Sequence, residues 1–243
     1  MAKVFAEFNT TGTFVVYDVS TDQMTGYNQE RADTRYVPAS TFKIPNSLIA
    51  LATGTVKNTS EVLPYGGGTY SRKVWEQDMS LTDAMKVSNV PVFQGVARNI
   101  GMKNMQSYIQ KFQYGNMELG AAVDTFWLRG PLKISAVEQT LFLAKLAQGT
   151  LPVDAQPQAM VKEITLMEKG DHWALHAKTG WYEQAMYENK DKDIGWWVGW
   201  IEKDGRIYAF ALNTDIDSQS NAKDLENRVL IGKACLRILG LYP

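Results

Sequence analysis

The stretch Pro38-Ala39-Ser40-Thr41-Phe42-Lys43 begins an apolar segment whose periodicity predicts a buried helix ending at Gly54. Ser40 and Lys43 are three residues apart, about one helical turn, so their side chains can lie on one face of this helix. A hydroxyl beside an amine pairs a potential nucleophile with a potential base. Serine is also a favoured helix cap, so a capping Ser40 followed by a solvated Lys43 explains the same pattern taken alone.

Pro45 restricts where this helix can begin. Proline has no backbone N–H and is tolerated only near a helix start. We therefore expect the helix N-terminus close to Ser40, with the hydroxyl in the positive end of the helix dipole, where an attacking oxyanion is favoured.

The composition is that of an ordinary globular protein. The chain has 243 residues, of which 45% are hydrophobic and 21% charged, and its net charge is −1. Nothing in this balance indicates binding to nucleic acid or to an anionic membrane, and no apolar run is long enough to span a bilayer. Cys235 is the single cysteine and there are two histidines, so we expect neither an intramolecular disulfide nor a metal site.

Segments rich in β-branched and aromatic residues lie near both ends of the chain. We expect strands at residues 12–18, 25–28, 172–180, 194–201 and 206–213, the last two joined by a hairpin turn at 203–205. Strand 194–201 is apolar on both faces, as is typical of a central strand. Helical patterns cover residues 81–112 with a break at 88–91, then 135–149, 155–167 and 222–239.

This order of elements predicts an α+β fold. The economical arrangement is one central antiparallel sheet built from both chain ends, flanked by terminal helices, with an all-helical lobe inserted between them. We expect residues 1–243 to form a single catalytic domain with two lobes, residues 1–55 plus 168–243 and residues 56–167.

Two further segments carry groups of the kind that Ser40 would need. Lys178-Thr179-Gly180 ends a predicted strand, where alternation places Lys178 and Gly180 on one face. A cation, a hydroxyl and a glycine that leaves room for a ligand suit an acylating substrate that bears a carboxylate. A surface lysine before a turn is the alternative interpretation. Ser88-Asn89-Val90 lies in the helix break, where a serine side chain can be exposed to a cleft.

The order S-x-x-K, S-x-V and K-T-G is similar to that of serine β-lactamases and penicillin-binding proteins. From about residue 10 to the C-terminus the chain closely resembles the class D (oxacillinase-type) β-lactamases. The matching segments are residues 38–43, 88–90, 114–116, 126–128, 178–180 and 194–200.

The resemblance implies four catalytic residues, namely Ser40, Lys43, Ser88 and Lys178. Ser40 would be acylated, and the backbone N–H groups of Ser40 and Trp181 would form the oxyanion hole. Lys43 would act as the base after N-carboxylation by CO2, which needs a neutral amine and hence an apolar pocket. The implied pocket residues are Phe42, Val90 and Trp127, whose indole N–H would donate to the carbamate.

Other residues are implied to bind the substrate. Thr179, Gly180 and Arg228 would hold the substrate, with Thr179 and Arg228 on its carboxylate, since arginine suits bidentate carboxylate recognition. For Trp127 the alternative is ordinary core packing, and for Arg228 it is a surface position on the last helix. Two features depart from the family pattern: Arg129 follows Phe-Trp-Leu, and residues 182–193 form a long polar insertion.

The implied activity is hydrolysis of β-lactams through a serine acyl-enzyme, which would confer resistance to penicillins and oxacillin-type antibiotics. A β-lactam sensor domain that stays acylated and a penicillin-binding transpeptidase are the alternatives. The expected partner is a small β-lactam, with neither nucleic acid nor membrane, and the protein would be a monomer or a homodimer. We expect a periplasmic or secreted location, with the signal peptide absent from this sequence.

Overall fold

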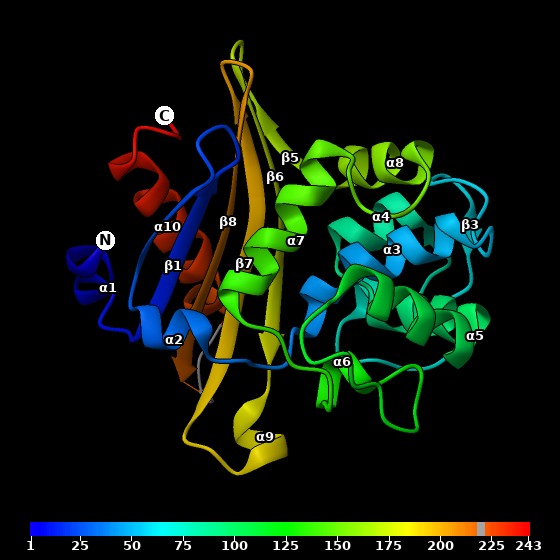
Figure 1. Ribbon diagram of the computed structural model, residues 1–243. Coiled ribbons are helices and arrows are strands. Elements are labelled where there is room, and N and C mark those ends of the chain that lie inside the picture. The colour runs from blue at the N-terminus through cyan, green and yellow to red at the C-terminus, as the bar shows by residue number, and fades with distance from the viewer. Residues whose placement is uncertain (218–221) are drawn as a thin grey trace.

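A single antiparallel sheet forms the centre of the molecule (Figure 1). The computed structural model describes residues 1–217 and 222–243. Six strands follow the spatial order β2-β1-β8-β7-β6-β5, and each neighbouring pair is antiparallel. Their bounds are β1 (Gly12–Asp18), β2 (Gln23–Tyr27), β5 (Leu166–Lys169), β6 (Trp173–Tyr182), β7 (Lys192–Lys203) and β8 (Arg206–Asp217). The sheet therefore joins both ends of the chain, and the predicted α+β fold is confirmed.

β7 is central and apolar on both faces, as its sequence predicts. Trp196, Val198 and Trp200 point into the larger core, beneath the helices of the middle of the chain. Trp197 and Ile201 alternate with them and point into a second core on the opposite face. This alternation lets one strand support two hydrophobic layers.

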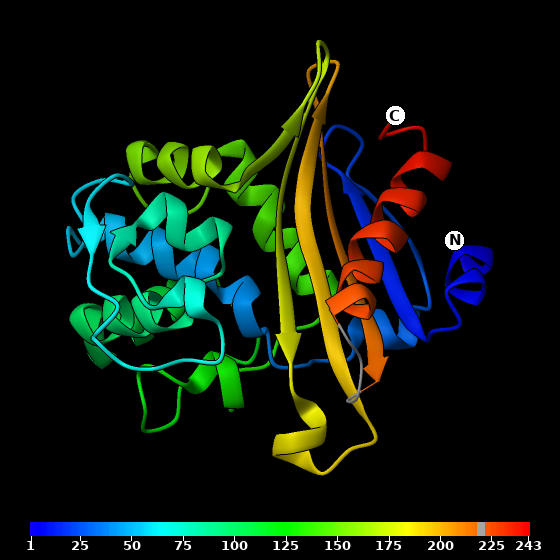
Figure 2. The same ribbon diagram turned by 180° about the vertical axis from the view of Figure 1, so that it is seen from behind.

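The two faces are covered by different helices (Figure 2). α1 (Ala2–Glu7) and α10 (Ala222–Ile238) lie on the face of the second core. α2 (Gln29–Asp33) and α7 (Ala136–Gln148) pack against the other face. α7 begins with a capping box, in which Ser135 and Glu138 bind each other's backbone N–H groups.

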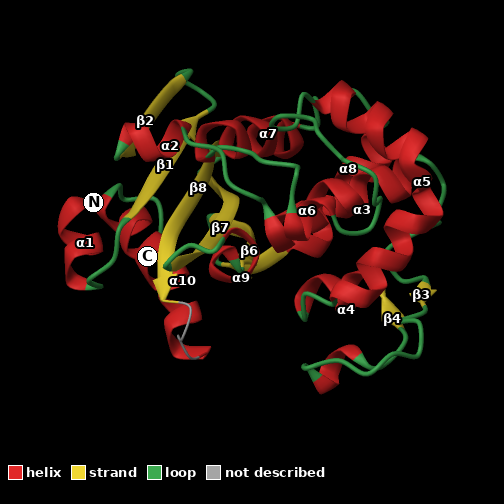
Figure 3. Cartoon of the chain, turned by 90° about the horizontal axis from the view of Figure 1, so that it is seen from below, coloured by secondary structure: helices red, strands yellow, loops and turns green. Residues whose placement is uncertain are grey.

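The remaining helices gather on one side of the sheet, and the view along it in Figure 3 separates them from the strands. They are η1 (Ala39–Phe42), α3 (Lys43–Ala52), η2 (Lys73–Trp75), α4 (Leu81–Lys86), α5 (Val90–Phe112), α6 (Phe126–Arg129) and α8 (Ala155–Thr165). A small hairpin of β3 (Val62–Leu63) and β4 (Met79–Ser80) precedes α4. No described helix is both long and apolar enough to cross a membrane.

Three local expectations differ from the structure. The helix predicted at 155–167 ends at Thr165, because the next residues pair with β6 as the edge strand β5. The segment between β2 and η1, for which no helix was expected, contains the short helix α2. The insertion at 182–193 contains a helix, α9 (Gln184–Glu188). For β5 the pairing with β6 overrides the local helical pattern, whereas α2 is capped locally by the side chain of Asn28.

Candidate active site

Ser40 lies in the short 3-10 helix η1, directly before α3. The Nζ of Lys43 donates a hydrogen bond to the Oγ of Ser40 at 2.8 Å. η1 and α3 have no side-chain cap, so Ser40 is not a capping residue. The α-helix begins at Lys43, later than expected, because η1 occupies the turn before it. The serine and the lysine therefore form the pair that their spacing predicts.

A buried chain of hydrogen bonds fixes the turn that carries Ser40. The Nε2 of Gln139 donates to the Oγ1 of Thr41 at 2.8 Å, and this hydroxyl donates to the carbonyl O of Pro38 at 2.8 Å. The Oε1 of Gln139 in turn accepts from the hydroxyl of Tyr114 at 3.0 Å. Because all these groups are buried, each bond replaces one to water and is costly to lose.

Lys43 is completely buried among aromatic rings. Its Nζ lies 5.3 Å from the centroid of the Phe93 ring. On the neighbouring position, Phe42 stacks on Trp127 with ring centroids 5.3 Å apart. Val90 is half-buried at the start of α5, one turn before Phe93. Burial, followed by the charges of nearby cations, holds the pKa of Lys43 well below its usual value.

Trp127 is fully buried, and its indole N–H has no hydrogen-bond partner among the described residues. A buried donor without an acceptor destabilises the folded state, so packing against Phe42 alone does not explain a tryptophan at this position. An acceptor carried on Lys43 would satisfy it. The donor and the neutral amine therefore fit the carbamate that the resemblance implies.

β6 packs directly against the turn of Ser40. A β-carbon on Gly180 would lie 3.0 Å from the carbonyl O of Pro38 and 3.0 Å from the Cγ2 of Thr41. The indole N–H of Trp196, on the adjacent strand, donates to the carbonyl O of Val37 at 3.0 Å. The missing side chain of Gly180 lets strand and turn approach each other, and the expected role of Gly180 in leaving room for the ligand stays a prediction.

Lys178 precedes this contact and is also buried. Its Nζ donates to the carbonyl O of Thr179 at 3.0 Å and lies 3.4 Å from its Oγ1. Burial lowers the pKa of Lys178 to about 7, with further contributions from the charges of Arg228 and Arg72. A cavity of about 160 Å3 adjoins Lys178 and Thr179 and extends over apolar side chains toward α10.

Arg228 projects from α10 over the sheet. A β-carbon on Gly195 would lie 3.5 Å from its Cδ, and Gly195 is the partner of Trp181 in the pairing of β6 with β7. The Nε and Nη1 atoms of Arg228 are buried without a partner among the described residues. Burial lowers its pKa to about 10. The guanidinium is thus not a solvated helix arginine, and it presents free donors beside the K-T-G strand.

Ser88 lies in the predicted break between α4 and α5. Its φ of +55° is in the left-handed region, which few non-glycine residues adopt. The next residue, Asn89, caps α5 by accepting from the backbone N–H of Val92 at 3.1 Å. The Ser88 hydroxyl makes no hydrogen bond within the described part of the chain. It is therefore available to a substrate.

The insertion after β6 is tied to the loop that follows α6. Arg129 lies over the ring of Tyr187, with its Cζ 5.4 Å from the centroid. Nearby, Lys133 pairs with Glu188 at 3.1 Å. The indole of Trp181 donates to the Oδ2 of Asp193 at 2.8 Å. These contacts explain Arg129, whereas the oxyanion role of the Trp181 backbone stays a prediction.

Sequence reasoning missed three residues of this region. Phe93 carries a helical signal that places it near Val90, so spacing from the helix start could have found it. Gln139 gives no signal of its own, because its partners come from distant segments. Arg72 lies in a stretch that reads as irregular, and its charge acts on both Lys43 and Lys178.

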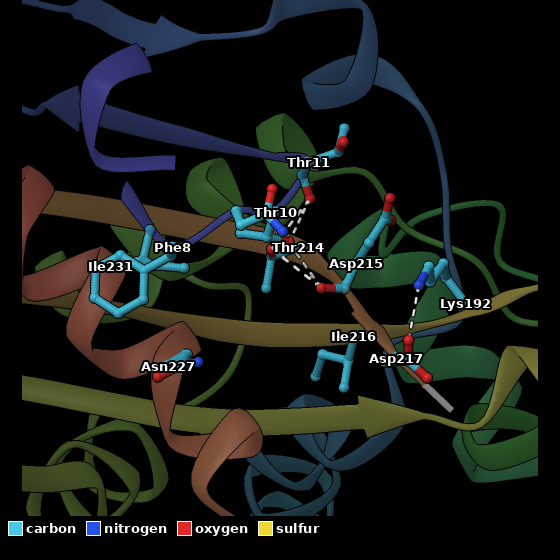
Figure 4. A pocket seen from close by; sticks show the side chains of 11 residues that line it. Phe8, Thr10, Thr11, Lys192, Thr214, Asp215, Ile216, Asp217, Asn227 and Ile231 are labelled. Atoms are coloured by element: carbon cyan, nitrogen blue, oxygen red, sulfur yellow. Dashed lines mark hydrogen bonds and ion pairs between the residues drawn. The ribbon is translucent and has the colours of Figure 1, made fainter. Parts of the chain in front are cut away.

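A separate cavity of about 360 Å3 lies between the end of β8, the start of β1 and α10 (Figure 4). Its charged groups are already paired: Asp215 binds Arg31 at 2.7 Å, and Lys192 binds Asp217 at 3.0 Å. None of the predicted site residues is among the described residues that line it. We therefore place the active site at Ser40.

Comparisons with known proteins agree with this geometry. Residues 12–235 match the family described as penicillin binding protein transpeptidase domain. β-Lactamase OXA-5 of Pseudomonas aeruginosa is 39% identical over 96% of this chain and 88% of its own length. β-Lactamase OXA-48 of Klebsiella pneumoniae is 41% identical over 87% of this chain and 78% of its own length. The crystal structure of FUS-1 (OXA-85), a class D β-lactamase from Fusobacterium nucleatum subsp. polymorphum, superposes with a TM-score of 0.92 and 43% identity, covering 100% of this chain and 98% of that one.

The fold and the hydrogen-bonded serine–lysine pair beside a K-T-G strand thus define a serine enzyme of the penicillin-binding transpeptidase type. Within that class the chain belongs to the class D serine β-lactamases.

Proposed function

We propose that this enzyme hydrolyses penicillins and oxacillin-type β-lactams, with Lys43 N-carboxylated by CO2 as the general base for acylation and deacylation. The observation that carries the proposal is the environment of Lys43. Its amine is buried, has a strongly lowered pKa and contacts Ser40. The Trp127 N–H, which has no partner among the described residues, lies in the same aromatic cluster. A carboxylate carried on this amine would be the general base of the reaction, and it would accept a proton more effectively than the neutral amine alone.

Ser40 attacks the β-lactam carbonyl carbon, and the ring amide C–N bond breaks to leave an ester on Ser40. The backbone N–H groups of Ser40 and Trp181 stabilise the oxyanion. Ser88 passes a proton to the lactam nitrogen, with Lys178 beside it. Water then attacks the ester carbonyl, and the opened acid leaves while Ser40 recovers its proton.

Groups beside the K-T-G strand orient the substrate by binding its carboxylate. Arg228 and Thr179 bind the carboxylate, and the two nitrogens of Arg228 that have no partner among the described residues support this assignment. Phe42, Val90 and Trp127 exclude water from Lys43 and hold its amine neutral. Hydrolysis in the periplasm or outside the cell would give resistance to these antibiotics; that location stays a prediction.

Mass spectrometry after mixing with benzylpenicillin tests the proposal. The wild-type protein should return rapidly to its unmodified mass, Lys43→Ala should stay acylated, and Ser40→Ala should never be acylated. Persistent acylation of the wild type for hours would instead identify a sensor domain or a transpeptidase. The presence of Val90 and Trp127 favours a β-lactamase that turns over its substrate, rather than a sensor domain or a transpeptidase.

The carboxylation of Lys43 has a test of its own. Degassing at low pH should remove activity, and bicarbonate should restore it. If Lys43→Ala hydrolysed benzylpenicillin at the wild-type rate, or if bicarbonate had no effect on activity, the base would be a different group.

A further inference from the structure

Arg72 lies beside the Ser88 turn, at the start of residues 72–75, a segment that we call the platform. Arg72 directly precedes η2, and its Cζ lies 5.1 Å from the centroid of the Trp75 ring. The indole N–H of Trp75 donates to the carbonyl O of Val87 at 3.1 Å. The carbonyl O of Trp75 accepts from the Nδ2 of Asn89 at 3.2 Å. Hydrogen bonds therefore hold the platform to Val87 and Asn89, the residues on either side of Ser88.

The charge of Arg72 is not neutralised by the protein. Arg72 is exposed and forms no ion pair within the described part of the chain, whereas its neighbour Lys73 pairs with Glu76. Its field nevertheless reaches both Lys43 and Lys178 and contributes to lowering the pKa of each. The contacts of Trp75 with Val87 and Asn89 place Arg72 next to the Ser88 turn, which agrees with this effect on the two lysines.

Two arginines then border the site from opposite lobes. Arg228 reaches it from α10, over Gly195 of the sheet. Arg72 reaches it from the helical side, beside the Ser88 turn. A penicillin with a single carboxylate occupies one of them, and under the proposed function that one is Arg228. The other remains free for a second anionic group.

We propose that Arg72 is a specificity-determining residue that binds a second anionic group, a carboxylate or sulfonate, on the side chain of the β-lactam. Stacking on Trp75 holds the planar guanidinium in place, so little freedom is lost when it binds an anion. The guanidinium offers a bidentate fork to such a group. The inference rests on the proposed hydrolysis and adds a preference among its substrates.

Three penicillins that share one phenylacetyl side chain test this preference. Their α-carbon carries hydrogen (benzylpenicillin), a carboxylate (carbenicillin) or an ammonium group (ampicillin). We compare kcat/KM for the wild type, Arg72→Met, which keeps the contact with Trp75, and Arg72→Lys, which keeps the charge. Lys73→Met is the matched control, since it removes an adjacent charge that is already paired with Glu76.

Arg72→Met should lower the ratio of carbenicillin to benzylpenicillin kcat/KM by about two- to tenfold, as for a partly exposed ion pair. The ratio of ampicillin to benzylpenicillin should rise. Arg72→Lys should retain most of the carbenicillin preference, Lys73→Met should leave both ratios unchanged, and added salt should reduce the effect of Arg72→Met.

An equal loss for all three penicillins in Arg72→Met, or the same shift in Lys73→Met, would overturn the inference. Hydrolysis of benzylpenicillin by the wild type reports on the proposed function separately. Normal turnover with unchanged ratios therefore refutes only the role of Arg72.

Discussion

The Nζ of Lys43 lies 2.8 Å from the Oγ of Ser40, and no carboxylate of the described chain forms an ion pair with this lysine. Burial without a counter-charge favours the neutral amine, which is the form that can both accept a proton and react with CO2. The same burial makes the pair sensitive to every group that touches it. The following variants separate the contributions of these groups.

Trp127→Phe should raise the bicarbonate concentration needed for half-maximal activity. The change keeps an aromatic ring stacked on Phe42 but removes an N–H that has no partner within the described part of the chain. A hydrogen bond to a charged group contributes about 1.5–3 kcal/mol, so the requirement should rise about 10- to 100-fold. Activity measured against added bicarbonate gives this value.

Trp200→Phe is the matched control for Trp127→Phe. Trp200 is equally buried, and its indole N–H donates to the Oε1 of Glu202, on the same strand, at 3.2 Å. This variant should lose some stability and keep the wild-type bicarbonate requirement. A similar rise in both variants would mean that the Trp127 N–H does not bind the carbamate.

Lys178→Met should stabilise the protein at pH 6 while lowering its turnover. The folded-state pKa of Lys178 is lowered to about 7, whereas an unfolded lysine titrates near 10.4. Below pH 7 both states are protonated, so the full cost of the buried charge is present. Replacement of such a charge by an apolar group gains about 1–4 kcal/mol. Urea unfolding followed by fluorescence measures the gain.

The same titration predicts how stability changes with pH. Between pH 7 and about 10.4 the unfolded chain binds a proton that folded Lys178 lacks, so the free energy of unfolding rises with pH. Lys178→Met should reduce this slope by up to about 1.4 kcal/mol per pH unit. Lys233→Met, which removes a lysine paired with Glu168, should bring no gain at pH 6. Equal gains in both variants would contradict the unpaired charge of Lys178.

Gln139→Leu should lower both stability and kcat/KM. It leaves the hydroxyls of Tyr114 and Thr41 without their amide partner, at about 1–3 kcal/mol for each buried group. Thr41 belongs to the turn of Ser40, so the nucleophile loses its support. Gln158→Leu removes another buried glutamine network, around Leu151, and should reduce stability alone. If both variants keep wild-type kcat/KM, Gln139 has no positioning role.

Gly180→Ala should destabilise the protein by about 1–3 kcal/mol, because the added methyl group would overpack the contact between β6 and the Ser40 turn. Turnover should fall with it, since strand and turn must separate. Gly95→Ala on α5 meets no atom closer than 3.8 Å and should be neutral or slightly stabilising. Thermal unfolding of the two variants compares them, and a neutral Gly180→Ala would show that the contact can relax.

Much of the site follows from sequence because its motifs are local. The spacing of Ser40 and Lys43 defines a contact within one turn, and alternation along β6 places Lys178 and Gly180 on one face. Ser88 was likewise located by the break in its helix. These are properties of a few neighbouring residues, which periodicity describes well.

Contacts between distant segments were not predictable in this way. The contact of Gly180 with the Ser40 turn was not predicted, because its close neighbours Pro38 and Thr41 come from a distant part of the chain, whereas its role in leaving room for the ligand stays a prediction. Arg72 gave no signal, since its position depends on how the loop before α4 attaches to Val87 and Asn89. The helix predicted at 155–167 extends two residues into β5, because pairing with β6 decides the structure of this edge strand.

The hydrogen bond from Trp196 to the carbonyl O of Val37 lies where the sheet meets the helical side of the molecule. The nucleophile follows Val37 by only three residues, so the catalytic turn is itself part of the junction between these two halves. Heat or denaturant that opens this junction must inactivate the enzyme at the same step. Fraying of α1 or of the edge strand β2, by contrast, would leave activity intact, so residual activity measures the integrity of the junction rather than of the whole fold.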